Sequence, residues 1–266
     1  MCAVGLAFAK RQPIKAYEIT GSALDPAAQV TKNILTVKEL LAPLSREQLG
    51  IIECKMEKPK FPVLFYKPPT AIIGPGAPIH IPKVVQPVAQ HLPDYEVELT
   101  IVIGKAAKDV SPEDALDYVL AYTAANDVSF RYHQMAVSQW GFSKGYDNAT
   151  PIGPCLVAAT ALPNPQRVSL KTTLNGQVLQ DGNTAYTSSS DQLFGVRETI
   201  AFLSQGTTLL PGSIIMTGTP KGVGWVKQPP VYLKNGDNVT IWIDGGIGSL
   251  VNPVIEEGKT TAKSKL

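Results

Sequence analysis

The clearest alternation of apolar and polar residues along the chain runs from Tyr95 to Gly104. Such alternation predicts a β-strand, in which successive side chains point to opposite faces of a sheet. Glu96 and Glu98 therefore share one face of the expected strand, and the apolar residues share the other. Shorter apolar runs, cut by proline and glycine, predict further strands at Val119–Asp127, Val168–Asn175, Ser213–Thr217 and Asn238–Ile243.

Helical patterns are fewer than strand patterns. The run Val196–Ser204 predicts a helix, and a further helical stretch is expected at Thr36–Leu44. Another helix is expected to begin at Ser111 and continue through Tyr118, because serine can cap it and Pro112 suits the first helical position. Asn175-Gly176 predicts a type I′ hairpin turn. Together these elements predict an α+β fold that is rich in strands.

The character of the chain changes near residue 60, where short apolar runs divided by turn residues begin. We expect a small N-terminal segment over residues 1–60, a main domain over 61–256 and a flexible tail over 257–266. The 22 glycines and 22 prolines agree with a β-rich fold that has many turns.

Composition and charge exclude several classes of protein. The 266 residues include 24 lysines and arginines against 22 aspartates and glutamates, a formal net charge of +2, which argues against nucleic-acid binding. Apolar residues make up 44% of the chain, so wholesale disorder is excluded. No apolar run approaches the roughly 20 residues that span a bilayer. Cys2, Cys54 and Cys155 have neither zinc-site nor disulfide spacing.

The last three residues, Ser264-Lys265-Leu266, match a peroxisomal address that an import receptor reads. The stretch from Glu256 to Lys263 is polar, which favours an exposed tail. We expect recognition by this receptor and import into peroxisomes, or a cytoplasmic location if the tripeptide is a coincidence.

Glu96 and Glu98 are the first candidates for chemistry. Two like charges on one strand face repel each other, so the pair indicates either a solvated face or a cation site. Asp127 ends the apolar run from Val119, in surroundings that would normally bury it. Three carboxylates brought together would form an all-oxygen site suited to Mg²⁺ or Mn²⁺, with Ca²⁺ as a further option.

Polar residues cluster again between Arg131 and Asp147. Within this run, Lys144 can place a positive charge beside a substrate oxygen, although an ordinary surface lysine is the commoner explanation. Further along, residues 216–224 form the glycine-rich loop MTGTPKGVG, whose backbone N–H groups and threonine hydroxyls can hold a carboxylate. The loop lacks the glycine spacing and the Lys-Ser/Thr ending of a nucleotide P-loop.

Taken in order, six segments resemble the fumarylacetoacetate hydrolase superfamily. They are FPVLFYKP (61–68), YEVELTIVIG (95–104), YTAANDVSFRYHQ (122–134), QWGFSKGYD (139–147), QDGNT (180–184) and LPGSIIMTGTPKGVG (210–224). The resemblance covers most of residues 61–254. It implies a mixed β-roll catalytic domain over 61–256, a homodimer, and one divalent metal ion in each active site.

The resemblance also implies roles for individual residues. Glu96, Glu98 and Asp127 match the three metal ligands of the family. Lys144 matches its active-site lysine, and Gln134 matches a polar residue near the substrate. The remaining matches concern the substrate: Arg131 stands at the family's arginine position, followed here by Tyr132 instead of aspartate, and the Gly218 backbone and Thr219 match the loop that holds a carboxylate.

The activity that the resemblance implies is cleavage of a carbon–carbon bond in a 2-oxo or β-dicarbonyl acid through a metal-stabilised enolate. Lys144 would add positive charge where the enolate forms. Hydrolytic members of the family carry a lid segment before the strand at residue 61, with a His–Glu pair that activates water. No histidine precedes His80 in this chain, so we expect a shortened lid region without that pair.

Three explanations of the missing histidine remain open. The first is chemistry that needs no activated water, either decarboxylation of an oxaloacetate-like acid or isomerisation between keto and enol forms. In the second, His133 supplies the base for acylpyruvate-type hydrolysis, although a lone histidine is more often structural. The third is a truncated variant with weak or no hydrolase activity. A non-enzyme alternative, an inactive homologue that binds metabolites or pairs with an active subunit, is disfavoured because three buried acids without a cation would cost stability.

Overall fold

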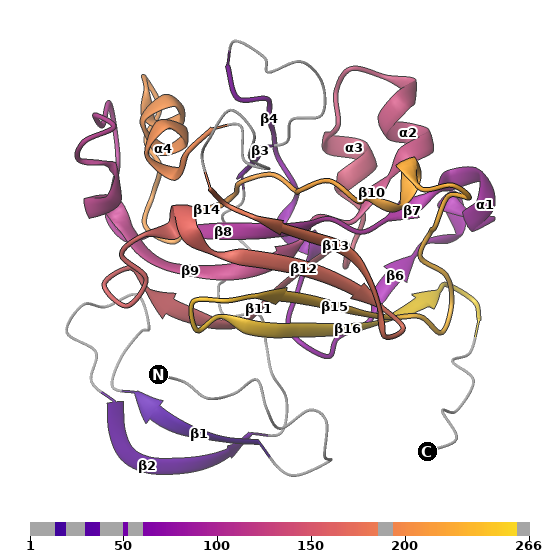
Figure 1. Cartoon of the computed structure of the whole chain (residues 1–266), viewed down its shortest axis with the longest axis horizontal. Coiled ribbons are helices and arrows are strands. Elements are labelled where there is room, and N and C mark those ends of the chain that lie inside the picture. The colour runs from indigo at the N-terminus through magenta and orange to yellow at the C-terminus, as the bar shows by residue number, and fades with distance from the viewer. Residues whose placement is uncertain (1–13, 20–29, 38–49, 53–60, 186–193, 260–266) are drawn as a thin grey trace.

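The computed structural model describes residues 14–19, 30–37, 50–52, 61–185 and 194–259. Two large β-sheets, one of seven strands and one of five, face each other and enclose the main hydrophobic core (Figure 1). This arrangement confirms the predicted strand-rich α+β fold. Among the described residues, no helix has the length and apolar character that a membrane crossing requires.

The seven-stranded sheet carries most of the segments in which site residues were predicted. Its strands run in the order β4-β3-β14-β8-β9-β11-β5, and parallel pairs at β3–β14 and β5–β11 make the sheet mixed. The bounds of its strands are β4 Leu64–Phe65, β3 Gly50–Ile52, β14 Ile214–Met216, β8 Val97–Ile103, β9 Val119–Asn126, β11 Thr150–Ala158 and β5 Ile72–Ile73.

The five-stranded sheet covers one face of the first sheet, in the order β13-β12-β15-β16-β6. Its strands are β13 Gln177–Asn183, β12 Ser169–Leu174, β15 Asn238–Ile243, β16 Gly248–Glu256 and β6 Ile79–Ile81. Two further pairs are β1 Ile14–Ile19 with β2 Val30–Val37, and β7 Pro93–Asp94 with β10 Ser129–Phe130.

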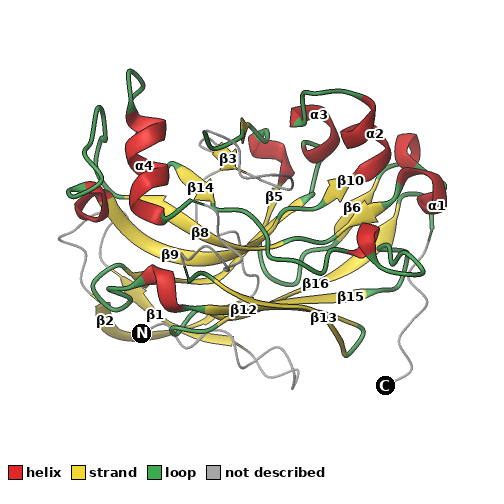
Figure 2. Ribbon diagram, turned by 45° about the horizontal axis from the view of Figure 1, so that its top comes forward, coloured by secondary structure: helices red, strands yellow, loops and turns green. Residues whose placement is uncertain are grey.

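The helices are short and lie at the ends of the sheets. Figure 2 shows α1, α2 and α3 grouped at one end and α4 at the other. The α-helices are α1 Val88–His91, α2 Arg131–Ala136, α3 Gly141–Lys144 and α4 Val196–Ser204. The 3₁₀-helices are η2 Pro69–Ala71, η3 Lys83–Val85, η4 Ala115–Tyr118, η5 Pro165–Arg167 and η6 Gly224–Val226.

Strand β8 is buried on both faces. Its residues Val97, Leu99, Ile101 and Ile103 enter the main core between the two sheets. On the opposite face, Val102 joins a second apolar cluster that includes Phe65, Ile72, Ala125 and Met216. A strand between two apolar clusters leaves no solvated face, so any acid on it must be neutralised inside the protein.

Several predicted elements are confirmed with small changes of boundary. The helix at Val196–Ser204 matches the prediction, and Asn175 and Gly176 have the positive φ angles, 50° and 87°, of a type I′ turn. The helix expected from Ser111 is only the 3₁₀-helix η4, which begins at Ala115, because the Ser111 hydroxyl accepts from the Asp114 N–H and closes a separate turn.

The predicted N-terminal segment is wrong in two respects. Thr36 and Val37 end strand β2 instead of beginning a helix, and residues 38–44 lie outside the described residues. Strand β3, at residues 50–52, pairs with β4 and β14, so the seven-stranded sheet begins before residue 61. The expected shortened lid before Phe61 and the tripeptide at 264–266 both fall on residues that are not described.

Candidate active site

Three buried carboxylates meet where β8 and β9 lie side by side. Glu96 precedes β8, Glu98 lies within it, and Asp127 directly follows β9. The Asp127 N–H donates to the Glu96 carbonyl at 2.9 Å, which holds the two strand ends together. One oxygen atom from each carboxylate lies within 4.8 Å of the others. All three side chains are fully buried, so the alternative of a solvated strand face is wrong.

Lys144 reaches this cluster from the last position of α3. Its ammonium nitrogen lies 2.8 Å from Oε2 of Glu96 and 2.6 Å from Oδ2 of Asp127. The side chain is fully buried, which excludes the alternative of an ordinary surface lysine. The structure thus brings together four of the residues singled out from the sequence, although they come from three separate elements.

Lys67 contacts the same cluster and was not predicted. Its ammonium lies 2.6 Å from Oδ1 of Asp127 and donates to the carbonyl of Ala149 at 3.0 Å. Burial lowers the pKa of the Lys67 ammonium, and the Asp127 carboxylate opposes this shift only in part. A lone lysine in the apolar run before Pro68 was the available signal in the sequence.

The charges of the site fit a divalent cation. Three cationic and four anionic side chains are buried together, namely Lys67, Lys144, Arg131, Asp94, Glu96, Glu98 and Asp127. Ionised, they sum to a net charge of −1, which a divalent cation would turn to +1 and an anionic substrate would then offset. The three clustered carboxylates offer only oxygen ligands, the type that Mg²⁺ and Mn²⁺ prefer, and no sulfur or nitrogen ligand that would favour zinc.

Arg131 links this cluster to a fourth buried acid, Asp94. The guanidinium of Arg131 contacts Oε1 of Glu96 at 2.5 Å and Oδ2 of Asp94 at 2.9 Å, and it donates to Oε1 of Gln134 at 2.7 Å. These contacts hold Arg131 and Gln134 beside the carboxylates. They make Arg131 a support of the candidate metal ligand Glu96, and the substrate-binding role expected from the sequence stays a prediction.

The glycine-rich loop that follows β14 lies along the segment from Asp94 to Leu99. Thr217 donates from its backbone N–H to the Leu99 carbonyl, and the Gly218 N–H donates to Oε2 of Glu98 at 2.6 Å. At the far end of the loop, the N–H groups of Gly224 and Trp225 donate to Asp94 at 2.7 and 3.0 Å. The predicted substrate loop is therefore bonded to β8 at its first end and to Asp94 of β7 at its far end.

Thr219 lies half-buried in the middle of this loop. Its hydroxyl oxygen accepts a hydrogen bond at 2.8 Å from the side chain of Gln180, a buried residue of β13. Gln180 belongs to the QDGNT segment, but its link to Thr219 was not predicted. Asp94 was also missed, although it stands only two residues before Glu96.

His133 lies in an aromatic cluster around α2 and α3. Its Nδ1 is 3.0 Å from the Tyr146 hydroxyl, and its ring packs against those of His91 and Phe142. Burial lowers the pKa of the His133 imidazole, and the charge of His91 lowers it further. Within the described part of the chain, no hydrogen bond joins His133 to the three carboxylates.

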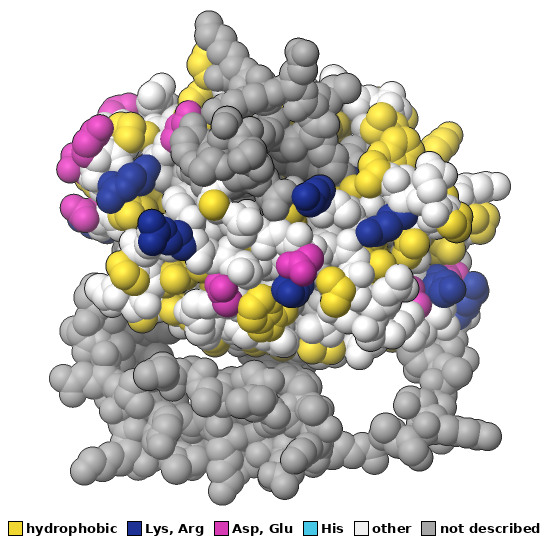
Figure 3. All heavy atoms as spheres, in the orientation of Figure 1, with side chains coloured by type: hydrophobic (Ala, Val, Ile, Leu, Met, Phe, Trp, Pro, Cys, Tyr) yellow, Lys and Arg dark blue, Asp and Glu magenta, His cyan; other side chains and the backbone are white. Residues whose placement is uncertain are grey.

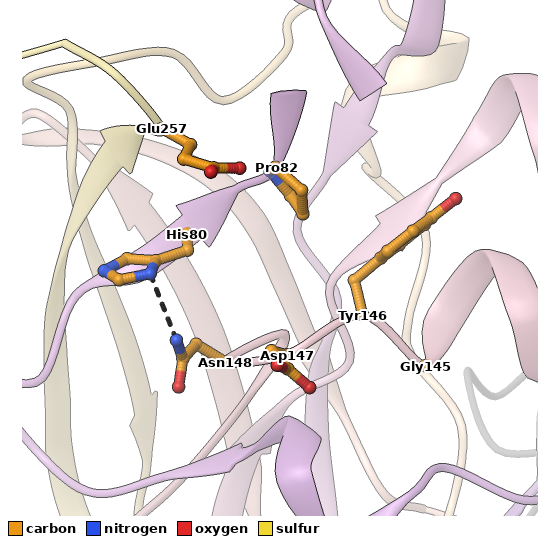
Figure 4. Close-up of a pocket in the computed structure, with 7 residues that line it drawn as sticks. All are labelled: His80, Pro82, Gly145, Tyr146, Asp147, Asn148 and Glu257. Carbon is orange, nitrogen blue, oxygen red and sulfur yellow. Dashed lines mark hydrogen bonds between the residues drawn. The ribbon is translucent and has the colours of Figure 1, made fainter. Parts of the chain in front are cut away.

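A separate cavity of about 440 Å³ lies beside the segment that follows Lys144 (Figure 4). It is lined by His80, Pro82, Gly145, Tyr146, Asp147, Asn148 and Glu257. The Asn148 side-chain nitrogen lies 3.1 Å from Nδ1 of His80, the contact drawn in Figure 4. Asp147, which the sequence groups with Lys144, thus lines this cavity and is not one of the three clustered carboxylates.

The comparisons with known proteins agree with this geometry. The family model described as fumarylacetoacetate (FAA) hydrolase C-terminal matches residues 33–255. A caffeoylpyruvate hydrolase from Neonothopanus nambi is 54% identical over 268 residues, which cover 96% of this chain and 85% of that protein.

Two solved structures support the same assignment. The 2-hydroxyhepta-2,4-diene-1,7-dioate isomerase from Mycobacterium marinum superposes with a TM-score of 0.79 at 36% identity, covering 93% of this chain and 90% of that one. A maleylpyruvate hydrolase from Sphingobium sp. SYK-6, in complex with manganese(II) and pyruvate, gives a TM-score of 0.68 at 29% identity, with 86% and 77% coverage. The chain therefore belongs to the fumarylacetoacetate hydrolase family.

Proposed function

We propose that this protein is an acylpyruvate hydrolase that cleaves a carbon–carbon bond and depends on a divalent cation. The observation that carries the proposal is the buried cluster of Glu96, Glu98 and Asp127, two of which contact the ammonium of Lys144. Two of the similar proteins, the caffeoylpyruvate and maleylpyruvate hydrolases, are named for substrates that contain an acylpyruvate group. A small 2-oxo or β-dicarbonyl acid is accordingly the expected ligand.

The reaction balances with water as the second reactant. Water adds to the acyl carbonyl carbon, and the bond from that carbon to the neighbouring methylene breaks. The electron pair stays on the methylene as the enolate of pyruvate, which then takes a proton. One acylpyruvate and one water thus give one carboxylic acid and one pyruvate.

The residues divide the work between charge stabilisation and substrate binding. Bound at the three carboxylates, Mg²⁺ or Mn²⁺ supplies Lewis-acid stabilisation of an enolate. Lys144 holds a fixed positive charge at the edge of the same cluster, where negative charge on a substrate oxygen would be stabilised without rearrangement of the protein. Thr219, on the loop bonded to β8, is the proposed contact for the substrate carboxylate.

A second candidate activity is isomerisation or decarboxylation of a similar acid at the same site. It is favoured by the lack of any histidine before His80, since neither reaction needs an activated water. The similarity to an isomerase from Mycobacterium marinum points in the same direction. If the reaction is hydrolysis, His133 stays the histidine predicted to act as the base that activates water.

Product analysis separates these activities. We would incubate the protein and Mg²⁺ with an aromatic acylpyruvate and, separately, with oxaloacetate, and identify the products by mass. Release of the aromatic acid with pyruvate supports hydrolysis, pyruvate with CO₂ indicates decarboxylation, and altered enol content alone indicates a tautomerase. Rates equal to those without enzyme would contradict every enzymatic proposal and favour a metabolite-binding protein.

Lys144→Met is the variant that tests the site itself, and we expect it to lose at least about 100-fold in kcat because the positive charge beside the substrate is removed. The matched control is Lys171→Met, which removes a lysine whose side chain is 39% exposed and pairs with the exposed Asp181. Equal kcat in the two variants would contradict the role of Lys144.

We also propose that two copies of the chain associate. Large apolar side chains are exposed on or beside α2 and α3, including Tyr132, Met135, Val137 and Phe142. On the face shown in Figure 3, hydrophobic side chains gather over these helices, whereas charged side chains are scattered. Light scattering should give twice the chain mass of 28.5 kDa. A monomer at micromolar concentration would contradict the proposal.

A further inference from the structure

Gln180 is a buried side chain that joins three parts of the molecule. It lies in β13 of the five-stranded sheet and is 1% exposed. Its carbonyl oxygen accepts from the Val97 N–H at 3.1 Å and from the Thr172 hydroxyl at 2.7 Å. Its amide nitrogen donates to the Thr219 hydroxyl oxygen at 2.8 Å and to the Pro220 carbonyl at 2.9 Å. All four hydrogen-bonding positions of the side chain are thereby used.

These partners fix which end of the amide is oxygen and which is nitrogen. A backbone N–H can only donate, so the atom that faces Val97 must be the carbonyl oxygen. A backbone carbonyl can only accept, so the atom that faces Pro220 must be the nitrogen. The two constraints agree, and the amide orientation therefore follows from partners whose roles cannot change.

The orientation of Gln180 determines the role of the Thr219 hydroxyl. Because the Gln180 nitrogen donates to Thr219 Oγ1, one lone pair of that oxygen is occupied and its proton must point elsewhere. No group in the described part of the chain accepts this proton. The neighbouring Gly218 N–H already donates to Glu98 and the Thr217 hydroxyl donates to the Leu99 carbonyl, so the Thr219 hydroxyl is the side-chain donor that this part of the loop can offer to a substrate.

We infer that Gln180 is a positioning residue that holds the Thr219 hydroxyl with its proton free to donate, and that it thereby makes the site favour substrates with an anionic oxygen at this position. The inference rests on the proposed function, because it takes Thr219 as the contact for the substrate carboxylate. A hydroxyl that donates its proton bonds more strongly to a carboxylate than to a neutral carboxamide, since a charged acceptor strengthens the hydrogen bond.

Val97 gives the link a second consequence. It lies between Glu96 and Glu98, so Gln180 bonds to the backbone at the centre of the candidate metal-binding segment. The Gln180 amide thus bonds both to the strand segment that carries Glu96 and Glu98 and to the Thr219 hydroxyl.

The test compares binding of pyruvate and its neutral analogue pyruvamide to the whole protein by titration calorimetry in the presence of Mg²⁺. Thr219→Val should lower the preference for pyruvate by about fivefold, the difference between a charged and a neutral hydrogen bond. Gln180→Met should lower it in the same direction, and the double variant should lose no more than Thr219→Val alone. Thr219→Ser, which keeps the hydroxyl, should retain the preference.

Two controls separate positioning from a structural role. Gln86→Met removes a glutamine amide that also donates to two carbonyl groups, those of Ile81 and Glu257, and should leave the preference unchanged. If Gln180→Met weakens pyruvate and pyruvamide binding by the same factor, its role is structural and the inference is overturned. Should Gln180→Met fail to fold, Gln180→Asn, which is too short to reach both Val97 and Thr219, replaces it.

Failure of this inference about Gln180 can be distinguished from failure of the proposed hydrolase activity. If the variants change the preference as expected but no acylpyruvate is cleaved, the proposed activity fails and the inference stands. If acylpyruvate is hydrolysed while Gln180→Met keeps the wild-type preference, the inference fails and the proposed activity stands.

Discussion

Asp127 is held from two sides by buried ammonium groups. Lys67 lies 2.6 Å from one of its carboxylate oxygens and Lys144 lies 2.6 Å from the other. Such pairs are costly to desolvate, but once they are formed the loss of one partner leaves a buried charge without compensation. The two lysines therefore place positive charge against both oxygens of Asp127, and the position of this side chain depends on them.

Removal of Lys67 tests this account at a single side chain. Lys67→Met should lower the free energy of unfolding by about 3–5 kcal/mol, because it breaks a fully buried pair with Asp127. Lys171→Met breaks an exposed pair with Asp181 and should change it by less than about 1 kcal/mol. Urea denaturation of both variants without added metal provides the comparison, and equal losses would contradict a special role for Lys67.

The sequence predicted the site residues that a local pattern or a family motif marks, and it missed Lys67 and Asp94, whose roles depend on distant partners. Glu96 and Glu98 share a strand face by simple alternation, and Asp127 is marked by its position after an apolar run. Lys67 meets Asp127 across 60 positions, and Asp94 meets Gly224 across 130. No periodicity links residues so far apart, so their pairing depends on strand order, which the pattern does not specify.

At the scale of elements, the loop after β14 is hydrogen-bonded along its length to the segment 94–99. Thr217, Gly218 and Gly224 each bond to a residue of the segment 94–99. The Tyr95 hydroxyl adds a hydrogen bond to the Gly222 carbonyl at 3.2 Å. A substrate loop bonded along its length is preorganised, so it does not have to lose conformational freedom when a ligand binds.

Gly224 is the position at which this packing is tightest. A methyl group there would overlap the Val231 carbonyl oxygen and lie 2.8 Å from Oδ1 of Asp94. Gly224→Ala should therefore lower the unfolding free energy by more than about 3 kcal/mol. Gly141→Ala, whose methyl group would meet only the Tyr66 carbonyl at 3.3 Å, should change it by less than about 1 kcal/mol. An unfolding free energy of Gly224→Ala equal to that of the wild-type protein would contradict this packing against Val231 and Asp94.

The contact between α1 and α2 predicts a pH dependence. Burial and the charge of His91 lower the pKa of His133 in the folded protein, so the unfolded chain binds the proton more readily. Stability should then fall as the pH drops below about 6.5, the ordinary pKa of histidine, and should be fully present above it. In His133→Gln the loss of stability between pH 7 and pH 5 should be smaller. An unchanged pH profile would contradict the shift.

The predicted boundaries of helices and strands agree best with the structure where a single local sequence pattern determines them. The helix at Val196–Ser204 was found because it buries one face, with Val196, Ile200 and Ser204 inside. The segment after Ser111 carries residues that favour a helix start. The Ser111 hydroxyl instead accepts from the Asp114 N–H in a local turn, and only η4 follows. The same helix signals therefore gave different results, because side-chain hydrogen bonds near a helix start compete with the helix itself.

At the scale of the whole molecule, two sheets enclose one core and the site lies on the other face of the larger sheet. The main core contains the residues of β8 that alternate with Glu98. Because β8 is buried on both sides, bulk water cannot screen the charged groups of the cluster. The fold thus places the carboxylates that would bind a divalent cation in a buried site, where water competes little for them.

The tripeptide Ser264–Leu266 leads to a prediction for the whole chain in cells. A fluorescent protein placed before residue 1 leaves the tripeptide exposed and should accumulate in peroxisomes. The same fusion without residues 264–266 should stay in the cytosol. Microscopy of the two fusions against a peroxisomal marker tests this expectation, and cytosolic signal from both would contradict it.

Thermal unfolding with and without a divalent cation tests the central claim most directly. If Glu96, Glu98 and Asp127 hold the ion, Mg²⁺ or Mn²⁺ at 100 times its Kd should stabilise the protein by about 2.7 kcal/mol and raise its Tm. Glu98→Ala, which removes one of the three ligands, should abolish the increase, whereas Glu257→Ala, which removes an exposed acid, should retain it. An unchanged Tm of the wild-type protein with Mg²⁺, Mn²⁺ and Ca²⁺ would contradict the account.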